Sequence, residues 1–224
     1  MPYRKIPIVP SQIYHVFNRS IAGQTIFSVQ KDYQRFIDVI NYYRFDNLPI
    51  RYSHYKRLTQ GQRDLFNDEF LTNNKSIIHI VSYCVMPNHF HLLLFSDKEH
   101  AISNFTRNVQ NSYSKYYNTK YERNGSLFQS MFKAVRIEND EQLIHVSRYI
   151  HLNPITAYLI EVNRLEEYNW SSIKAFLSDG EINSFLEPDL VLSNFKSRAK
   201  YREFLVDQVD YQRELDKIKH LVFE

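Results

Sequence analysis

Two β-rich runs separated by only three residues constrain the fold of this chain most strongly. Residues 76–85 alternate in the manner of a strand, and residues 89–95 form a second, largely apolar run. Between them, Met86-Pro87-Asn88 is a tight connection. The segment is therefore predicted to be a β-hairpin, with His89 at the beginning of its second strand.

Two histidines stand two positions apart at the start of that strand. Side chains i and i+2 of a strand share a face, so His89 and His91 converge while Phe90 points to the other face. Two such imidazoles are a natural bidentate set for a divalent cation and leave room for further ligands. A structural pair of histidines is the alternative, because a chain with 9 histidines in 224 residues contains a His-x-His triplet by chance about one time in three.

The rest of the chain has the patterns of further strands and helices. Asn139 is the expected N-cap of one helix, which should end near Asn153 because Pro154 disfavours helical geometry at the residue before it. The polar stretch 59–75 is expected to be a mobile loop or an insertion. The expected strands are 12–18 and a short one ending near residue 137, and the expected helices are 31–44, 101–117, 140–153 and a tail from about 197 to 221.

The helix over residues 140–153 carries the second group of candidate functional residues. Spacing of four places His145, Tyr149 and Asn153 along one side of it. Tyr149 offers a phenol, and Asn153 offers an amide oxygen that can bind a metal. If this side faces the histidines, the set suits phosphoryl transfer, with tyrosine as the nucleophile. A packing role for Tyr149, one of 17 tyrosines, is the alternative.

Positive charge is concentrated in two blocks. Residues 1–63 carry ten Lys or Arg and three Asp or Glu, and residues 103–136 carry six and one. In a chain with 17 Tyr and 16 Phe, such blocks suit a partner with phosphates and unstacked bases, although a solvated, tyrosine-rich surface is the alternative. The single cysteine excludes an intramolecular disulfide and a cysteine-ligated zinc site. With neither a membrane-length apolar run nor a leader sequence, a cytoplasmic, nucleoid-associated protein is expected.

Three motifs, in the order MPNHFHLLL, GSLFQSMFKAV and RYIHLNP, make the chain similar to the single-tyrosine HUH transposases, and specifically to the REP-associated tyrosine transposases. The resemblance runs from Tyr14 through about Leu159. It implies an α+β fold in which a ferredoxin-like antiparallel sheet has helices packed on one face. We expect residues 1–178 to form this domain and residues 179–224 to form an acidic, helical C-terminal extension.

The same resemblance assigns roles to individual residues. His89 and His91 match the HUH pair of metal ligands, and Asn153 matches the polar residue that completes a site for Mg²⁺ or Mn²⁺. Tyr149 matches the nucleophilic tyrosine. His151 also belongs to the RYIHLNP motif, but it lies on another side of the helix and is expected to be structural or to contact DNA.

The implied reaction is the metal-dependent cleavage and rejoining of single-stranded DNA that carries a hairpin, through a 5′-phosphotyrosine. No nucleotide cofactor is expected, and no P-loop motif is present in the sequence. The resemblance leaves open whether the protein acts as a monomer or a homodimer, and no membrane partner is expected. The candidate DNA contacts are Arg19, Arg107, Lys115, Lys133 and Arg136.

Three other functions are compatible with these residues. The first is a domesticated module that binds DNA hairpins without cutting them. The second is another HUH nuclease, such as a relaxase or a replication initiator, and the third is a metal-dependent phosphohydrolase that uses water. The chain also departs from many relatives at Ser20, where they have glycine, and at Met131, where they have a basic residue. These departures concern DNA contacts and leave the expected chemistry unchanged.

Overall fold

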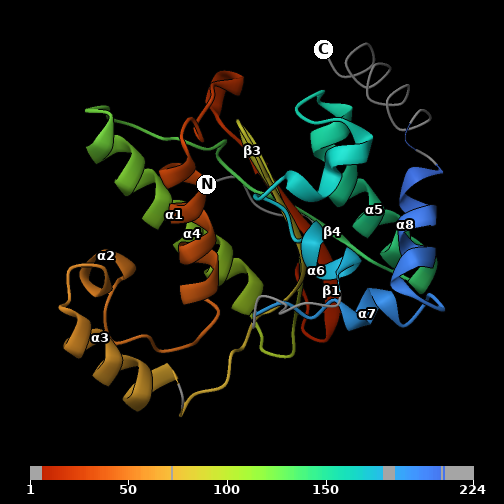
Figure 1. Ribbon diagram of the computed structural model, residues 1–224. Coiled ribbons are helices and arrows are strands. Elements are labelled where there is room, and N and C mark those ends of the chain that lie inside the picture. Colours follow the sequence, from red (N-terminus) through yellow and green to blue (C-terminus); the bar gives the residue numbers. More distant parts are fainter. Residues whose placement is uncertain (1–6, 72, 179–184, 208, 210–224) are drawn as a thin grey trace.

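Four strands form one antiparallel sheet in the order β2-β3-β1-β4 (Figure 1). The computed structural model describes residues 7–71, 73–178, 185–207 and 209. The expected hairpin is confirmed, because β2 and β3 pair with each other across Pro87-Asn88. The strands are β1 (Gln12–Arg19), β2 (His79–Met86), β3 (His89–Ser96) and β4 (Lys133–Arg136).

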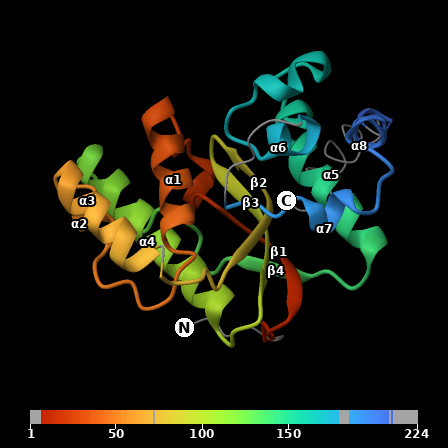
Figure 2. The same cartoon turned by 60° about the horizontal axis from the view of Figure 1, so that its bottom comes forward.

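The helices lie in two groups, one on each face of the sheet (Figures 1 and 2). The first group contains α1 (Gln30–Tyr42), α2 (Tyr52–Tyr55), α3 (Gln60–Phe66) and α4 (Ala101–Lys120). The second contains α5 (Asp140–Thr156), α6 (Ile173–Leu177), α7 (Asp189–Leu192) and α8 (Arg198–Val206), with the 3₁₀-helix η3 (Val162–Glu167). Within the described ranges, no helix is both long enough and apolar enough to span a bilayer.

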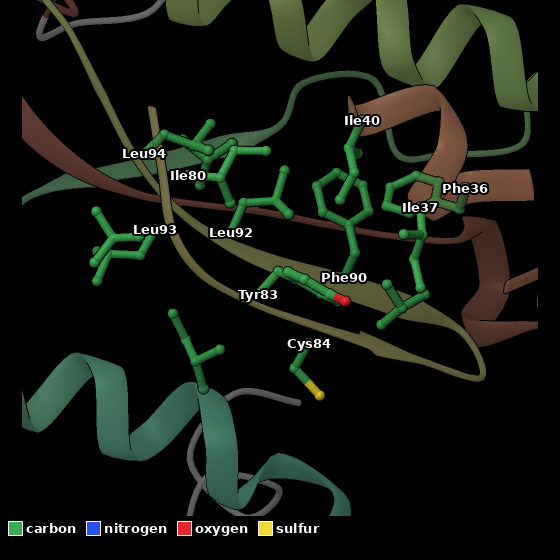
Figure 3. Packing of buried hydrophobic residues seen from close by; sticks show 14 of the residues in the cluster. Phe36, Ile37, Ile40, Ile80, Tyr83, Cys84, Phe90, Leu92, Leu93 and Leu94 are labelled. Atoms are coloured by element: carbon green, nitrogen blue, oxygen red, sulfur yellow. The ribbon is translucent and has the colours of Figure 1, made fainter. Parts of the chain in front are cut away.

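The expected α+β class with an antiparallel sheet is confirmed, but the helices cover both faces of the sheet rather than one. Phe90 packs against Phe36 of α1, with ring centroids 5.0 Å apart. Cys84 points to the opposite side of the sheet in Figure 3 and is also fully buried. Alternating residues of β2 and β3 are therefore apolar on both faces, and burying them requires a helical layer on each side.

Two local expectations were wrong. The stretch 59–75 is not a loop throughout, because Thr59 caps α3 by accepting a hydrogen bond from the backbone N–H of Gln62. The helix that carries Tyr149 does not end at Asn153, because it continues through Pro154 to Thr156. A proline in a helix removes a hydrogen bond to the carbonyl four residues earlier, and the burial of Leu152 and Ile155 on this last turn offsets that loss.

A buried polar network joins the helix α5 to the C-terminal part of the chain. Tyr201 of α8 is fully buried, and its hydroxyl lies 2.8 Å from Ser147 Oγ and 2.8 Å from His151 Nδ1. The other nitrogen of His151 lies 2.8 Å from Ser172 Oγ. Every member has a partner, so the network fixes the outer side of α5 without leaving a buried polar group unsatisfied.

The described part of the expected C-terminal extension thus packs against α5. Leu186 forms a bridge with Ile80 of β2, and the backbone N–H of Glu187 donates to the carbonyl of Ile80. Phe185 and Leu205 belong to the same buried cluster as the sheet. Ser197 caps α8, as expected for the start of the C-terminal helix, and residues 210–221 of that expected helix lie outside the described residues.

Removing the hydroxyl of Tyr201 is predicted to destabilise the fold. Tyr201→Phe removes the buried partner of His151 Nδ1 and of Ser147 Oγ, which costs about 1–3 kcal/mol in the free energy of unfolding. Urea denaturation followed by circular dichroism measures this loss. Tyr158→Phe is the matched control, since Tyr158 is 67% exposed and its substitution should change stability by less than about 0.5 kcal/mol. Equal effects of the two substitutions would contradict the network.

Stability is also predicted to fall in acid because of His151. Burial lowers the pKa of His151 to about 3, whereas an unfolded histidine titrates near 6.5. The unfolded chain therefore binds the proton more readily, and stability is lost as the pH falls from about 6.5 towards 3, by up to about 1.4 kcal/mol per pH unit. His151→Gln should be less stable than wild type at pH 7 and have a shallower pH dependence. Urea denaturation between pH 7 and 4 measures the free energy of unfolding of both proteins. If it falls equally with pH in wild type and in His151→Gln, titration of His151 is not the cause of the loss.

Candidate active site

The strand register brings the two candidate metal ligands together at one end of the sheet. Arg19 is directly opposite His89, and Phe17 is directly opposite His91, in the β1–β3 pairing. The two imidazole ring centroids are 5.0 Å apart, with the ring planes nearly perpendicular at 88°. His91 is buried and His89 is half-buried, so His89 is the more accessible of the two. The predicted convergence of the pair is therefore present in the structure.

The helix α5 lies across this face and contributes the other two candidate residues. The Tyr149 ring centroid is 5.4 Å from that of His91, with the planes at 87°. One turn later, the Asn153 side chain lies next to His89. Asn153 Nδ2 also donates to the carbonyl of Tyr149 over 2.7 Å. Because that nitrogen is engaged by the helix, the amide oxygen is the atom that Asn153 offers to a cation.

Asn88 determines which nitrogen of His89 carries the proton. The side-chain nitrogen of Asn88 donates to the carbonyl of Gly23 over 3.0 Å, so its oxygen is the acceptor for His89 Nδ1, 2.6 Å away. His89 must therefore donate from Nδ1, which leaves the lone pair on Nε2. Metal-binding imidazoles are held in this way, with the nitrogen remote from the metal bonded to a neighbouring acceptor.

The electrostatic environment keeps His89 neutral. Burial and the positive charge of Arg19 lower the pKa of His89 to about 4, although the hydrogen bond to Asn153 opposes this shift. A neutral imidazole presents an unprotonated nitrogen at physiological pH. His89 is therefore in the protonation state that metal coordination needs.

The structure adds one histidine that sequence reasoning missed. His15 of β1 is buried, and its Nε2 lies 2.9 Å from Nδ1 of His91. Its ring centroid is also 5.9 Å from that of Tyr149. Alternation along the strand QIYHVFN puts His15 and Phe17 on one face. Only the pairing of β1 beside β3 shows that this face is the one that carries His91.

The chemistry of the donor set fits a divalent cation. Two imidazoles and one amide group, from His89, His91 and Asn153, lie close together at the end of the sheet next to the Tyr149 ring. Imidazole and carbonyl oxygen ligands both bind metals such as Mn²⁺, while Mg²⁺ prefers oxygen. Among the described residues, no group of three or more His, Cys, Asp and Glu side chains offers a metal site.

Two other histidines of α5 are not part of this group. His145 Nδ1 lies 2.6 Å from the guanidinium of Arg148, and its ring contacts Phe204 of α8 with centroids 5.5 Å apart. His151 is fully buried between Tyr201 and Ser172. Of the two roles expected for His151, the structural one agrees with this burial, because a fully buried side chain does not reach DNA.

The candidate DNA contacts fall into separate locations. Arg19 and Lys133 lie on the histidine face, and Lys133 Nζ is 5.9 Å from the centroid of the Phe17 ring. Arg136 is exposed on β4 opposite Tyr14, so it points to the other face. Arg107 and Lys115 belong to α4, in the helical layer on that other face. Arg19 and Lys133 are thus the two candidates beside the Tyr149 group.

The motif GSLFQSMFKAV packs against the end of the sheet at which His89 lies. The backbone N–H of Gln129 donates to the carbonyl of Arg19, and Asn18 Nδ2 donates to the carbonyl of Gln129. Phe128 is buried and forms a bridge with Ser20. The segment therefore prolongs the pairing of β1 at the point where Arg19 stands opposite His89.

Sequence comparison finds a similarity over the central part of the chain. Residues 55–153 match the family described as IS200-like transposases, and this range includes His89, His91, Tyr149 and Asn153. This part of the chain is therefore similar to IS200-like transposases, in agreement with the resemblance to single-tyrosine transposases. No curated protein matches the chain.

Two solved structures are similar to this chain. The fold is similar to that of a REP-associated tyrosine transposase solved with a REP hairpin, with a TM-score of 0.53 and 14% identity over 84% of this chain and 97% of that one. A putative transposase from Deinococcus radiodurans R1 also matches, with a TM-score of 0.36 and 14% identity over 66% of this chain and 95% of that one. The first similarity supports the assigned fold.

Asn88 is predicted to hold His89 in the tautomer with the proton on Nδ1. In ¹⁵N NMR spectra of labelled protein at pH 7, wild-type His89 should show a protonated Nδ1 and a bare Nε2. Asn88→Ala removes the acceptor, and the signals should shift towards the tautomer protonated on Nε2. Asn104→Ala, an exposed position on α4, is the control and should leave the His89 signals unchanged. An unchanged tautomer in Asn88→Ala would show that another contact determines it.

Proposed function

We propose that the protein cleaves and rejoins single-stranded DNA next to a hairpin, with Tyr149 as the nucleophile. One observation carries the proposal. A single helix, α5, brings the Tyr149 ring centroid within 5.4 Å of the His91 ring centroid and places the Asn153 amide next to His89. A tyrosine next to a potential metal site is an arrangement suited to phosphoryl transfer.

His89, His91 and Asn153 would hold the Mg²⁺ or Mn²⁺ ion, with Asn88 and His15 orienting the two imidazoles through their Nδ1 atoms. When bound, the ion would polarise the scissile phosphodiester and offset the negative charge that repels the nucleophile. The low pKa of His89 makes its imidazole available as a ligand at neutral pH and down to mildly acidic pH.

In the proposed step, the Tyr149 oxygen forms a bond to phosphorus while the bond from phosphorus to the 3′ oxygen breaks. The phenolic proton leaves as the oxygen attacks, and the departing 3′ oxygen takes up a proton to become a hydroxyl. The products are a 5′-phosphotyrosine and a free 3′-OH. Because one phosphoester replaces another, a second 3′-OH can reverse the attack and join strands without a nucleotide cofactor.

Arg19 and Lys133 are proposed to position the DNA at the site. Arg19 stands opposite His89, and Lys133 lies on the same face beside Phe17. Lysine and arginine contacts to phosphates orient a strand without reading its sequence. A hairpin-bearing substrate is proposed because the structurally similar REP-associated tyrosine transposase was solved with a REP hairpin. Arg107, Lys115 and Arg136 remain candidates for DNA beyond the cleavage site.

The proposal is tested with labelled, hairpin-bearing single-stranded DNA and Mn²⁺ or Mg²⁺. Wild-type protein should form a covalent adduct that survives denaturation, and Tyr149→Phe should abolish it, by at least 1,000-fold, with DNA binding retained. Tyr158→Phe is the matched control and should retain the adduct, since Tyr158 lies beyond the end of α5 and is 67% exposed. Cleavage without an adduct would instead indicate a hydrolase, and binding without cleavage a domesticated hairpin-binding module.

A further inference from the structure

A second charged site lies in the helical layer on the opposite face of the sheet from Tyr149. A cavity of about 710 Å³ opens between α1, the segment around α2, and α4. No Asp or Glu side chain lines it, and five cationic side chains do: Arg35, Arg51, Arg57, Lys115 and Lys120. We refer to this cavity as the cationic groove. Cations gathered in a hollow concentrate a positive potential that favours an anionic ligand.

Most of these cations lack an internal counter-charge. Lys120 is paired with the buried carboxylate of Asp32 over 2.6 Å. The other four form no ion pair with any residue in the described part of the chain. Arg35 lies over the ring of Tyr52 at 4.3 Å and near that of Tyr116 at 5.1 Å, and its buried Nε has no hydrogen-bond partner among the described residues. An anion in the groove would supply the missing charge.

The wall formed by α4 is a row of hydrogen-bond donors. Asn108, Asn111, Ser112, Lys115 and Thr119 all line the groove, at spacings of three and four along one side of the helix. From residue 108 to residue 119 the row extends about 17 Å at the rise of an α-helix. In a duplex, one strand has a phosphate every ~3.4 Å along the axis, so the row passes about five phosphates. Lys, Asn, Ser and Thr side chains are common donors to DNA phosphates.

One end of the groove lies towards the end of the sheet that carries the Tyr149 site. Tyr113, near the C-terminal end of α4, donates from its hydroxyl to the carbonyl of Ile26 over 2.5 Å. The backbone N–H of Ile26 donates to the carbonyl of Pro87 over 2.8 Å. Pro87 belongs to the turn that precedes His89. A DNA strand that left the active site over this turn would approach the end of the groove where Lys120 lies.

We infer that the cationic groove binds the phosphodiester backbone of the DNA substrate, at nucleotides other than the pair joined by the scissile bond. The inference rests on the proposed function, since it assigns a second contact to the same substrate. All the charged side chains that line the groove are positive, and contacts of such side chains with phosphates supply affinity and orientation. They do not recognise bases. Either the duplex stem of a hairpin or its single-stranded flank offers this backbone.

The experiment compares two charge-matched triple variants of the full chain. The groove variant is Arg51→Gln, Arg57→Gln and Lys115→Gln. The control variant is Lys174→Gln, Lys196→Gln and Lys200→Gln, which removes the same charge from exposed positions among α6 to α8. Fluorescence anisotropy measures the affinity of each for hairpin DNA with a single-stranded flank between 50 and 300 mM salt. Thermal unfolding checks that both variants are folded.

The groove variant should bind at least tenfold more weakly than wild type at the lowest salt concentration. The slope of log affinity against log salt should be smaller by about 2 to 3, because three phosphate contacts are lost. The control variant should change affinity by no more than about twofold. A further measurement with an unstructured single strand of equal length distinguishes binding of the duplex stem from binding of the single-stranded flank. A loss confined to the hairpin assigns the groove to the stem, and an equal loss on both substrates assigns it to the single strand.

Groove and control variants that behave alike would overturn the inference, as would a wild-type protein with no measurable affinity for either DNA. Failure of the proposed function is recognised separately. A wild-type protein that binds DNA with the expected salt slope but forms no covalent adduct contradicts the role of Tyr149 and leaves the groove intact. An adduct with unchanged binding in the groove variant contradicts the groove alone.

Discussion

The site depends on the position of α5 across the face of the sheet that carries His89 and His91. This helix supplies Tyr149 and Asn153, and a small shift of its axis would separate both from the histidines. Two kinds of contact hold it. Its inner side buries apolar residues such as Ile150 against the core, and its outer side is joined to α8 by the hydroxyl of Tyr201. Buried apolar area supplies most of the stabilisation, and the hydrogen bonds add directional specificity.

The two faces of the sheet have different chemical characters. The face under α5 carries the histidines, and Arg19 and Lys133 stand beside them. The layer of α1 and α4 on the other face carries the cationic groove, which is lined by Arg and Lys side chains and by no Asp or Glu. The hairpin turn at Pro87-Asn88 lies between them, because it contacts Ile26 on one side and carries His89 on the other. A DNA strand bound at both places would pass around this turn.

Sequence reasoning located the central residues because their spacing is local. The pair His89 and His91 share a face in any strand, and Tyr149 and Asn153 share a side in any helix. The N-cap at Asn139 was also predictable, and it accepts a hydrogen bond from Gln142 as expected. His15 and Asn88 were missed, since their roles depend on which strand pairs with β3 and on which carbonyl lies near the hairpin turn. Periodicity within a segment contains neither piece of information.

The sequence by itself determined the hairpin, the long helices α1, α4 and α5, the candidate donor residues and the family resemblance, because each follows from residue types at short spacings. Tertiary structure decided that helices cover both faces of the sheet, that α5 continues through Pro154, and that His151 is a buried structural residue rather than a DNA contact. It also decided that cations from separate segments, such as Arg35, Arg51 and Lys115, line one groove. The physical reason is that such contacts join residues far apart in the chain, and packing of the whole core selects among the arrangements that local preferences allow.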